Sequence, residues 1–118
     1  MFEIISYETE DKICPVGDFL NTLEPKLLAK TMKTIDLLEE NGNKLRKPYS
    51  EYVEDGIFEL MVIQASNIVR ILYFFVVGKK AILTNGFVKK TQKTPKSEIK
   101  ITKKCKTDYE RRYGHEKI

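Results

Sequence analysis

The spacing of apolar residues predicts two helices near the start of the chain. Residues 15–23 place apolar side chains at helical spacing after Pro15, and residues 25–40 continue this pattern. Pro25 suits the first position of the second helix because it has no N–H to leave unbonded, and Gly42 suits the end. The apolar stripe of the second helix is formed by Leu28, Met32, Ile35 and Leu38.

The other apolar runs of the chain have the composition of β-strands. A short run rich in isoleucine and aromatic residues covers residues 2–7. Three longer runs of the same kind follow at residues 57–64, 67–77 and 79–90. Only two residues or one separate these runs, so they are expected to pair as antiparallel neighbours. The polar stretch at 43–56 is interpreted as a connection.

A last helix is predicted over residues 95–113, with Thr94 as its cap and Pro95 at its first position. Gly86, inside the preceding strand, is expected to mark a bulge or bend. The order of elements predicts one α+β domain over residues 1–118, with helices covering one face of an antiparallel sheet of about four strands. The stripe of the last helix is formed by Ile101, Cys105, Tyr109 and Tyr113.

Charge is divided unevenly between the two ends of the chain. The net charge is +4, but residues 1–78 carry 8 basic and 13 acidic side chains, whereas residues 79–118 carry 13 basic and 4 acidic ones. A basic half of this kind is typical of a surface that faces nucleic acid, and also of a solubilising lysine-rich tail. Charge alone does not decide between the two.

Two further patterns narrow the class of protein. The longest apolar run, ILYFFVV, has seven residues, which is too short to span a membrane, and the N-terminus does not read as a signal peptide. A cytoplasmic protein that makes no membrane contact is expected. Cys14 and Cys105 match neither a metal-ligand spacing nor a disulfide framework, so both are expected to be reduced thiols.

Three pieces of sequence resemble a known family when they are taken together. They are ELMV at 59–62, RILYFF at 70–75 and GFVKKTQKTP at 86–95. The chain resembles the RelE/ParE superfamily of bacterial toxins, in its phage-derived HigB-like branch. The resemblance covers nearly the whole chain and is strongest over residues 56–98. It implies a small RelE-like domain with two N-terminal helices packed on the sheet and a C-terminal basic helix.

The resemblance also implies a function and partners. The protein would be the toxin of a type II toxin–antitoxin system, a ribosome-dependent endoribonuclease that enters the ribosomal A site and cuts mRNA without a metal or cofactor. Its partners would be mRNA, ribosomal RNA and a HigA-like helix-turn-helix antitoxin, with operator DNA bound only through the antitoxin complex. Two alternatives remain open, because ParE-type relatives share the fold but poison DNA gyrase, and a basic RNA-binding module needs no catalysis.

Arg70 is the first candidate site residue, because it lies mid-strand in an otherwise apolar run. Strand alternation places it on the same face as Leu72 and Phe74, where a charge must be paired. It either forms a salt bridge with Glu59 on the neighbouring strand or clamps a phosphate, as the arginine at this point does in the superfamily. Glu59 is either a solvent-facing acid or a catalytic residue that acts as a base or orients Arg70.

Lysines crowd the point where the last strand meets the last helix. Lys90 and Lys93 are assigned catalytic roles, as general acid or base or in stabilising the charge of a pentacoordinate phosphate. The turn into Thr94-Pro95 is expected to bring them beside Arg70. The one histidine, His115, lies near the terminus, so the family's lysine- and arginine-based chemistry fits better. The residues expected to bind RNA phosphates are Lys89, Thr91, Lys96, Arg46 and Lys47.

Overall fold

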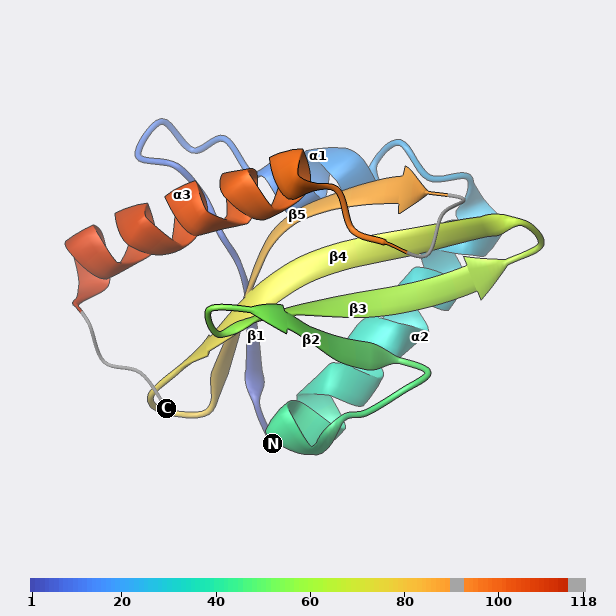
Figure 1. Cartoon of the computed structure of the whole chain (residues 1–118), viewed down its shortest axis with the longest axis horizontal. Helices are drawn as coiled ribbons and strands as arrows, with labels where there is room; N and C mark the ends of the chain where they lie inside the picture. Colours follow the sequence, from blue (N-terminus) through green and yellow to red (C-terminus); the bar gives the residue numbers. More distant parts are fainter. Residues whose placement is uncertain (90–92, 115–118) are drawn as a thin grey trace.

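Five strands and three α-helices follow one another along the residues that the computed structural model describes, which are 1–89 and 93–114 (Figure 1). The elements are β1 (Glu3–Ser6), α1 (Pro15–Leu20), α2 (Pro25–Asn41), the 3-10 turn η1 (Gly42–Lys44), β2 (Ser50–Glu54), β3 (Ile57–Gln64), β4 (Asn67–Val76), β5 (Lys80–Lys89) and α3 (Lys96–Tyr113). The helices predicted near the two ends of the chain and the run of three long strands are confirmed. The predicted start of the last helix is wrong, because α3 begins at Lys96 with Pro95 in the cap position and Thr94 does not cap it.

The strands form one mixed sheet in the order β1-β5-β4-β3-β2. The two predicted antiparallel hairpins, β3–β4 and β4–β5, are confirmed. The prediction of a four-stranded antiparallel sheet is wrong in two respects. β1 runs parallel to β5, and β2 lies inside the stretch that was interpreted as a connection. β2 is short and partly charged because it forms an edge of the sheet, so it lacks the apolar signature of its neighbours.

Helices cover both faces of the sheet, whereas the sequence predicted one covered face. Val69, Ile71 and Tyr73 of β4 join a core with α1 and α2. The alternate residues Leu72 and Phe74 pack instead with side chains of α3. In Figure 1, α3 lies in front of the sheet and α2 behind it. The continuous apolar run of β4 is the sign of a strand buried on both faces.

Threonines occupy buried positions on α2, so its apolar stripe differs from the predicted one. Met32 is 42% exposed, although the sequence placed it in the stripe. Thr31 and Thr34 face inward instead, because each hydroxyl donates to a carbonyl of its own helix, at 2.8 and 3.3 Å. The internal bonds remove the penalty for burying a hydroxyl group. The buried residues are Leu27, Thr31, Thr34, Ile35 and Leu38.

The same correction applies to α3. Ile101 and Tyr113 are 41% and 62% exposed, so two members of the predicted stripe face solvent. Thr102 is fully buried because its hydroxyl bonds to Asn85 Oδ1 at 2.7 Å, across the interface with β5. The buried residues of α3 are Ile99, Thr102 and Cys105. Hydropathy patterns miss such positions because threonine is scored as polar.

The bulge in β5 lies at Thr84 and not at Gly86. In the β4–β5 ladder Leu72 pairs with Asn85 and Tyr73 pairs with Leu83, which leaves Thr84 as the extra residue. Gly86 is needed for a different reason. A Cβ at this position would lie 2.4 Å from the ring of Phe19 in α1. The glycine therefore allows α1 to pack directly on the strand.

We expect Gly86→Ala to lower the free energy of unfolding by about 1–3 kcal/mol, because the new methyl group overlaps the Phe19 ring and forces α1 away from β5. Urea denaturation measures this change. A Phe19→Leu background, which opens space above position 86, should reduce the effect of the alanine. Equal stability of Gly86→Ala and the wild type would contradict the close packing.

Candidate functional site

Glu59 of β3 and Arg70 of β4 form a buried ion pair on the α3 face of the sheet. In the β3–β4 register, Arg70 pairs with Met61 and Glu59 with Leu72, which makes the two charged residues diagonal neighbours. The Arg70 Nη1 group donates to Glu59 Oε1, and the two side chains are only 2% and 5% exposed. The salt bridge considered from the sequence is confirmed, whereas the interpretation of Glu59 as a solvent-facing acid is wrong.

The segment that leads into α3 lies against this pair. Thr94, two residues before the helix, donates its hydroxyl to Glu59 Oε2. One oxygen of the Glu59 carboxylate therefore faces Arg70 and the other faces Thr94. Such an arrangement fits a residue that orients the guanidinium better than it fits a free general base. It also joins β3, β4 and the start of α3 through one buried carboxylate.

The predicted lysines fall partly outside the described residues. Lys93 is exposed and immediately precedes Thr94, so its backbone lies next to the residue that contacts Glu59. Lys96 is exposed at the first position of α3. Lys89 ends β5, where its backbone is paired in register with Ile68 of β4, and its side chain lies outside what the structure describes. Lys90 and Thr91, and also His115, lie outside the described residues.

Lysines cover the outer surface of α3. Lys96, Lys100 and Lys104 are exposed and follow one another at four-residue spacing, so they share one side of the helix. We call these three residues the α3 basic face. A hollow of about 510 Å³, lined in part by Lys100 and Lys104, opens beside it. The neighbouring Lys103 is paired with Glu54 at 2.6 Å and with Asp55 at 3.0 Å. The face begins next to the Thr94 contact with the buried ion pair.

The structure does not bring Arg46 to Arg70. The Arg46 Nη1 group donates to the carbonyls of Asn43 at 2.8 Å and Leu45 at 3.1 Å, in the connection before β2. Burial raises the pKa of Tyr73 to about 12, and the nearby Arg46 charge partly opposes that rise. Since Tyr73 packs on the α2 side, Arg46 lies across the sheet from the ion pair. Lys47 is exposed and pairs with Glu51 at 3.2 Å.

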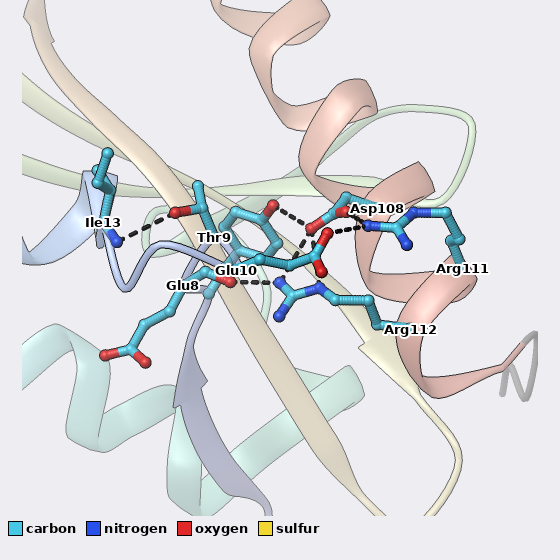
Figure 2. A network of polar contacts seen from close by, with 8 residues as sticks. Glu8, Thr9, Glu10, Ile13, Asp108, Arg111 and Arg112 are labelled. Carbon is cyan, nitrogen blue, oxygen red and sulfur yellow. Dashed lines mark hydrogen bonds and ion pairs between the residues drawn. The ribbon is translucent and has the colours of Figure 1, made fainter.

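A second polar network holds the far end of α3 to the loop after β1 (Figure 2). Tyr7 donates to Asp108 Oδ2 at 2.5 Å. Arg111 donates to Asp108 at 2.5 Å and to Glu10 at 2.6 Å, and Arg112 donates to Asp108 at 3.0 Å. This cluster was not predicted from the sequence. Asp108 is one of three acids in this lysine-rich helix, so the sequence offers little reason to single it out.

We expect the stability contribution of Asp108 to disappear in acid. Its hydrogen bonds from Tyr7 and then Arg111 lower its pKa from the ordinary 3.8 to about 2. A carboxylate whose pKa falls on folding stabilises the fold above its ordinary pKa, and this contribution is lost as the pH falls toward 2. Urea denaturation between pH 6 and pH 2 measures it. The stability gap between wild type and Asp108→Asn should close over that range, and a constant gap would contradict the assignment.

The geometry defines a small α+β domain in which a lysine-covered C-terminal helix starts beside a buried arginine–glutamate pair. Residues 18–107 match the family model described as "Phage derived protein Gp49-like (DUF891)", and the chain belongs to this family. The family is one of RelE/ParE-like toxins of toxin–antitoxin systems, and it implies an antitoxin partner. Among curated proteins, none matches the chain. In residues 1–89 and 93–114, no helix is long and apolar enough to cross a membrane.

Proposed function

We propose that this protein is a HigB-like toxin that cuts mRNA on the ribosome. The observation that carries the proposal is the Glu59–Arg70 pair, which fixes a guanidinium at the point where the lysine-bearing segment and α3 begin. Family membership supports the toxin class, and the resemblance of RILYFF and GFVKKTQKTP to the HigB-like branch supports the RNA-cleaving activity. The cytoplasmic ribosome would be the place of action.

The proposed reaction is attack of a ribose 2′-OH on the neighbouring phosphate. The 2′-OH loses its proton, the 2′-oxygen forms a bond to phosphorus, and the bond from phosphorus to the 5′-oxygen breaks. The leaving 5′-oxygen receives a proton. Lys90 and Lys93 are proposed to hold or move these protons. Arg70 is proposed to stabilise the added negative charge of the pentacoordinate phosphate.

Burial of Arg70 sets a condition on this mechanism. With its side chain 2% exposed, the guanidinium reaches a phosphate only if part of the chain that covers it moves aside. Among the described contacts, the hydrogen bond from Thr94 to Glu59 is the one proposed to break in this movement. Glu59 would keep the guanidinium oriented until RNA arrives.

The α3 basic face is proposed to carry the RNA backbone to this site. Lys96 lies at its start, and Lys100 and Lys104 extend it along the helix. Phosphate contacts of this type add affinity without reading sequence, and they weaken as salt rises. Arg46 and Lys47, which the sequence assigned to the same RNA surface, would meet a nucleic acid only on a separate part of the molecule.

The burial of Arg70 also favours a second candidate, a basic binding module without catalysis. A buried pair that only stabilises the sheet needs no access to RNA. A ParE-like inhibitor of DNA gyrase shares this fold and fits the same observation.

Expression of the wild-type protein in bacteria, with mRNA 5′ ends mapped within minutes of induction, separates these functions. New ends at codons loaded on ribosomes support the proposed activity. Growth arrest with intact mRNA and a DNA-damage response would identify a gyrase inhibitor. Absence of toxicity would leave the binding module. A helix-turn-helix antitoxin encoded by the neighbouring gene should suppress the toxicity in the first two cases.

A further inference from the structure

A pocket of about 590 Å³ opens on the α2 side of the sheet, across the sheet from the Glu59–Arg70 pair. It lies where the connection before β2 passes β2 and β3, and its volume is in the range of ligand pockets. The proposed function does not use it. It is lined by Asn43, Leu45, Arg46, Lys47, Ser50, Glu51, Tyr52 and Phe58.

Aromatic rings form the floor of this pocket. The Phe58 ring stacks on Tyr73, with centroids 5.6 Å apart, and Tyr52 packs edge-on against Phe58 at 5.2 Å. Tyr52 is nevertheless 57% exposed, which leaves a large ring facing solvent. The polar group at the floor, the Ser50 hydroxyl, is already bonded to the Tyr73 hydroxyl. The floor therefore offers apolar contact.

Positive charge predominates at the mouth of the pocket, where Glu51 is the acid among the lining residues. Arg46 donates hydrogen bonds to backbone carbonyls of the connection. These carbonyls are neutral, so the positive charge of the guanidinium can still attract an anion. Lys47 is paired with Glu51, but the lysine side chain is 73% exposed, so this ion pair is weak. Lys44 lies nearby in η1 and is exposed. The mouth is complementary to a carboxylate.

We propose that this pocket binds an acidic, extended segment of a partner protein, with an aromatic or large aliphatic side chain seated against Tyr52 and Phe58 and a carboxylate on Arg46. Ser50 and Tyr52 belong to β2, which ends the order of the sheet, so an extended segment can lie along this edge. Apolar anchors in pockets, with charges around them, are the usual arrangement of such contacts.

A nucleobase fits the same pocket less well. Its edge carries several donors and acceptors, and these lose water without compensation when they enter an apolar floor. The Ser50 hydroxyl is already engaged by Tyr73, so it is poorly placed to replace that water. A phenyl or leucyl side chain has no such groups to desolvate. The observations therefore favour a protein segment over RNA as the occupant.

Titration of the ¹⁵N-labelled full chain with a blocked hexapeptide, Glu-Asp-Phe-Leu-Asp-Glu, tests this proposal by NMR. The expected result is a saturable shift of amide signals within residues 43–58. Two matched peptides isolate the two kinds of contact: one has alanine in place of phenylalanine and leucine, and the other has lysine in place of every acid. Each should bind at least tenfold more weakly.

Protein variants complete the test. Arg46→Glu combined with Lys47→Glu should weaken binding of the acidic peptide at least tenfold, whereas Lys33→Glu, an exposed change on α2, should not. Hexauridylate serves as the RNA probe. Saturable shifts in residues 43–58 with hexauridylate and none with the peptide would overturn the proposal, as would peptide shifts confined to α3. None of these readouts depends on RNA cleavage, so the proposed function stands or fails separately.

Discussion

Replacing Arg70 with alanine is expected to lower the free energy of unfolding by about 3–5 kcal/mol, because it leaves the carboxylate of Glu59 charged and buried without its cation. Glu59→Ala should have a similar effect for the opposite reason. Removal of either partner exposes the full penalty of burying the other charge. The ion pair itself contributes little net stability, since desolvation of the two groups offsets most of their attraction.

The double variant Glu59→Leu with Arg70→Met separates the cost of leaving one charge buried and unpaired from the net contribution of the ion pair. Apolar side chains of similar volume remove both charges together, so most of the lost stability should return. Urea denaturation followed by tyrosine fluorescence measures all three variants, since the chain has six tyrosines and no tryptophan. Lys33→Ala, on the exposed surface of α2, is the matched control and should stay within about 0.5 kcal/mol of the wild type. A loss below about 1 kcal/mol for Arg70→Ala would contradict the buried pair.

Lys93→Ala is expected to slow mRNA cleavage on ribosomes by about 10²–10⁴-fold, the usual contribution of a general acid or base. Its free energy of unfolding should change by no more than about 0.5 kcal/mol, because the side chain is exposed. Purified protein, ribosomes and a short mRNA give the rate directly. Lys33→Ala should cleave at the wild-type rate.

Two further variants locate the chemistry. Lys100→Ala removes a proposed phosphate contact of the α3 basic face, so its effect should be modest and should shrink as salt rises. The double variant Glu59→Leu with Arg70→Met should be stable but inactive. This result would distinguish a catalytic arginine from a purely structural one. Full cleavage by this double variant, or by Lys93→Ala, would move the chemistry away from the proposed residues.

Local patterns were sufficient to predict the centre of the fold. The short turns between β3, β4 and β5 allow one antiparallel arrangement, and strand alternation then places Glu59 and Arg70 together. The features missed depend on contacts far apart in the chain. Parallel pairing of β1 with β5 leaves no mark in either strand, and β2 is too polar to stand out. Predicting these two strands requires knowledge of which edges of the central sheet are still unpaired.

The candidate site divides in the same way. The position of Arg70 on its strand predicted its face and its partner, and both are confirmed. Composition grouped Arg46 and Lys47 with the other basic residues, but the sheet lies between Arg46 and Arg70. A count of charges says nothing about which side of a sheet they occupy. The Asp108 network was missed because its partners in the loop after β1 are about a hundred residues away.

The parallel pairing of β1 has a consequence for synthesis of the protein. Glu3 pairs with Lys80, and Tyr7 reaches Asp108, 101 positions later. In the described part of the chain, β1 therefore has no partner strand until β5 has left the ribosome. Pairing of strands at such high sequence separation is intrinsically slow, because a long loop must close first. We expect a nascent chain that stops before β5 to remain an incomplete sheet, in which β1 still lacks its partner strand.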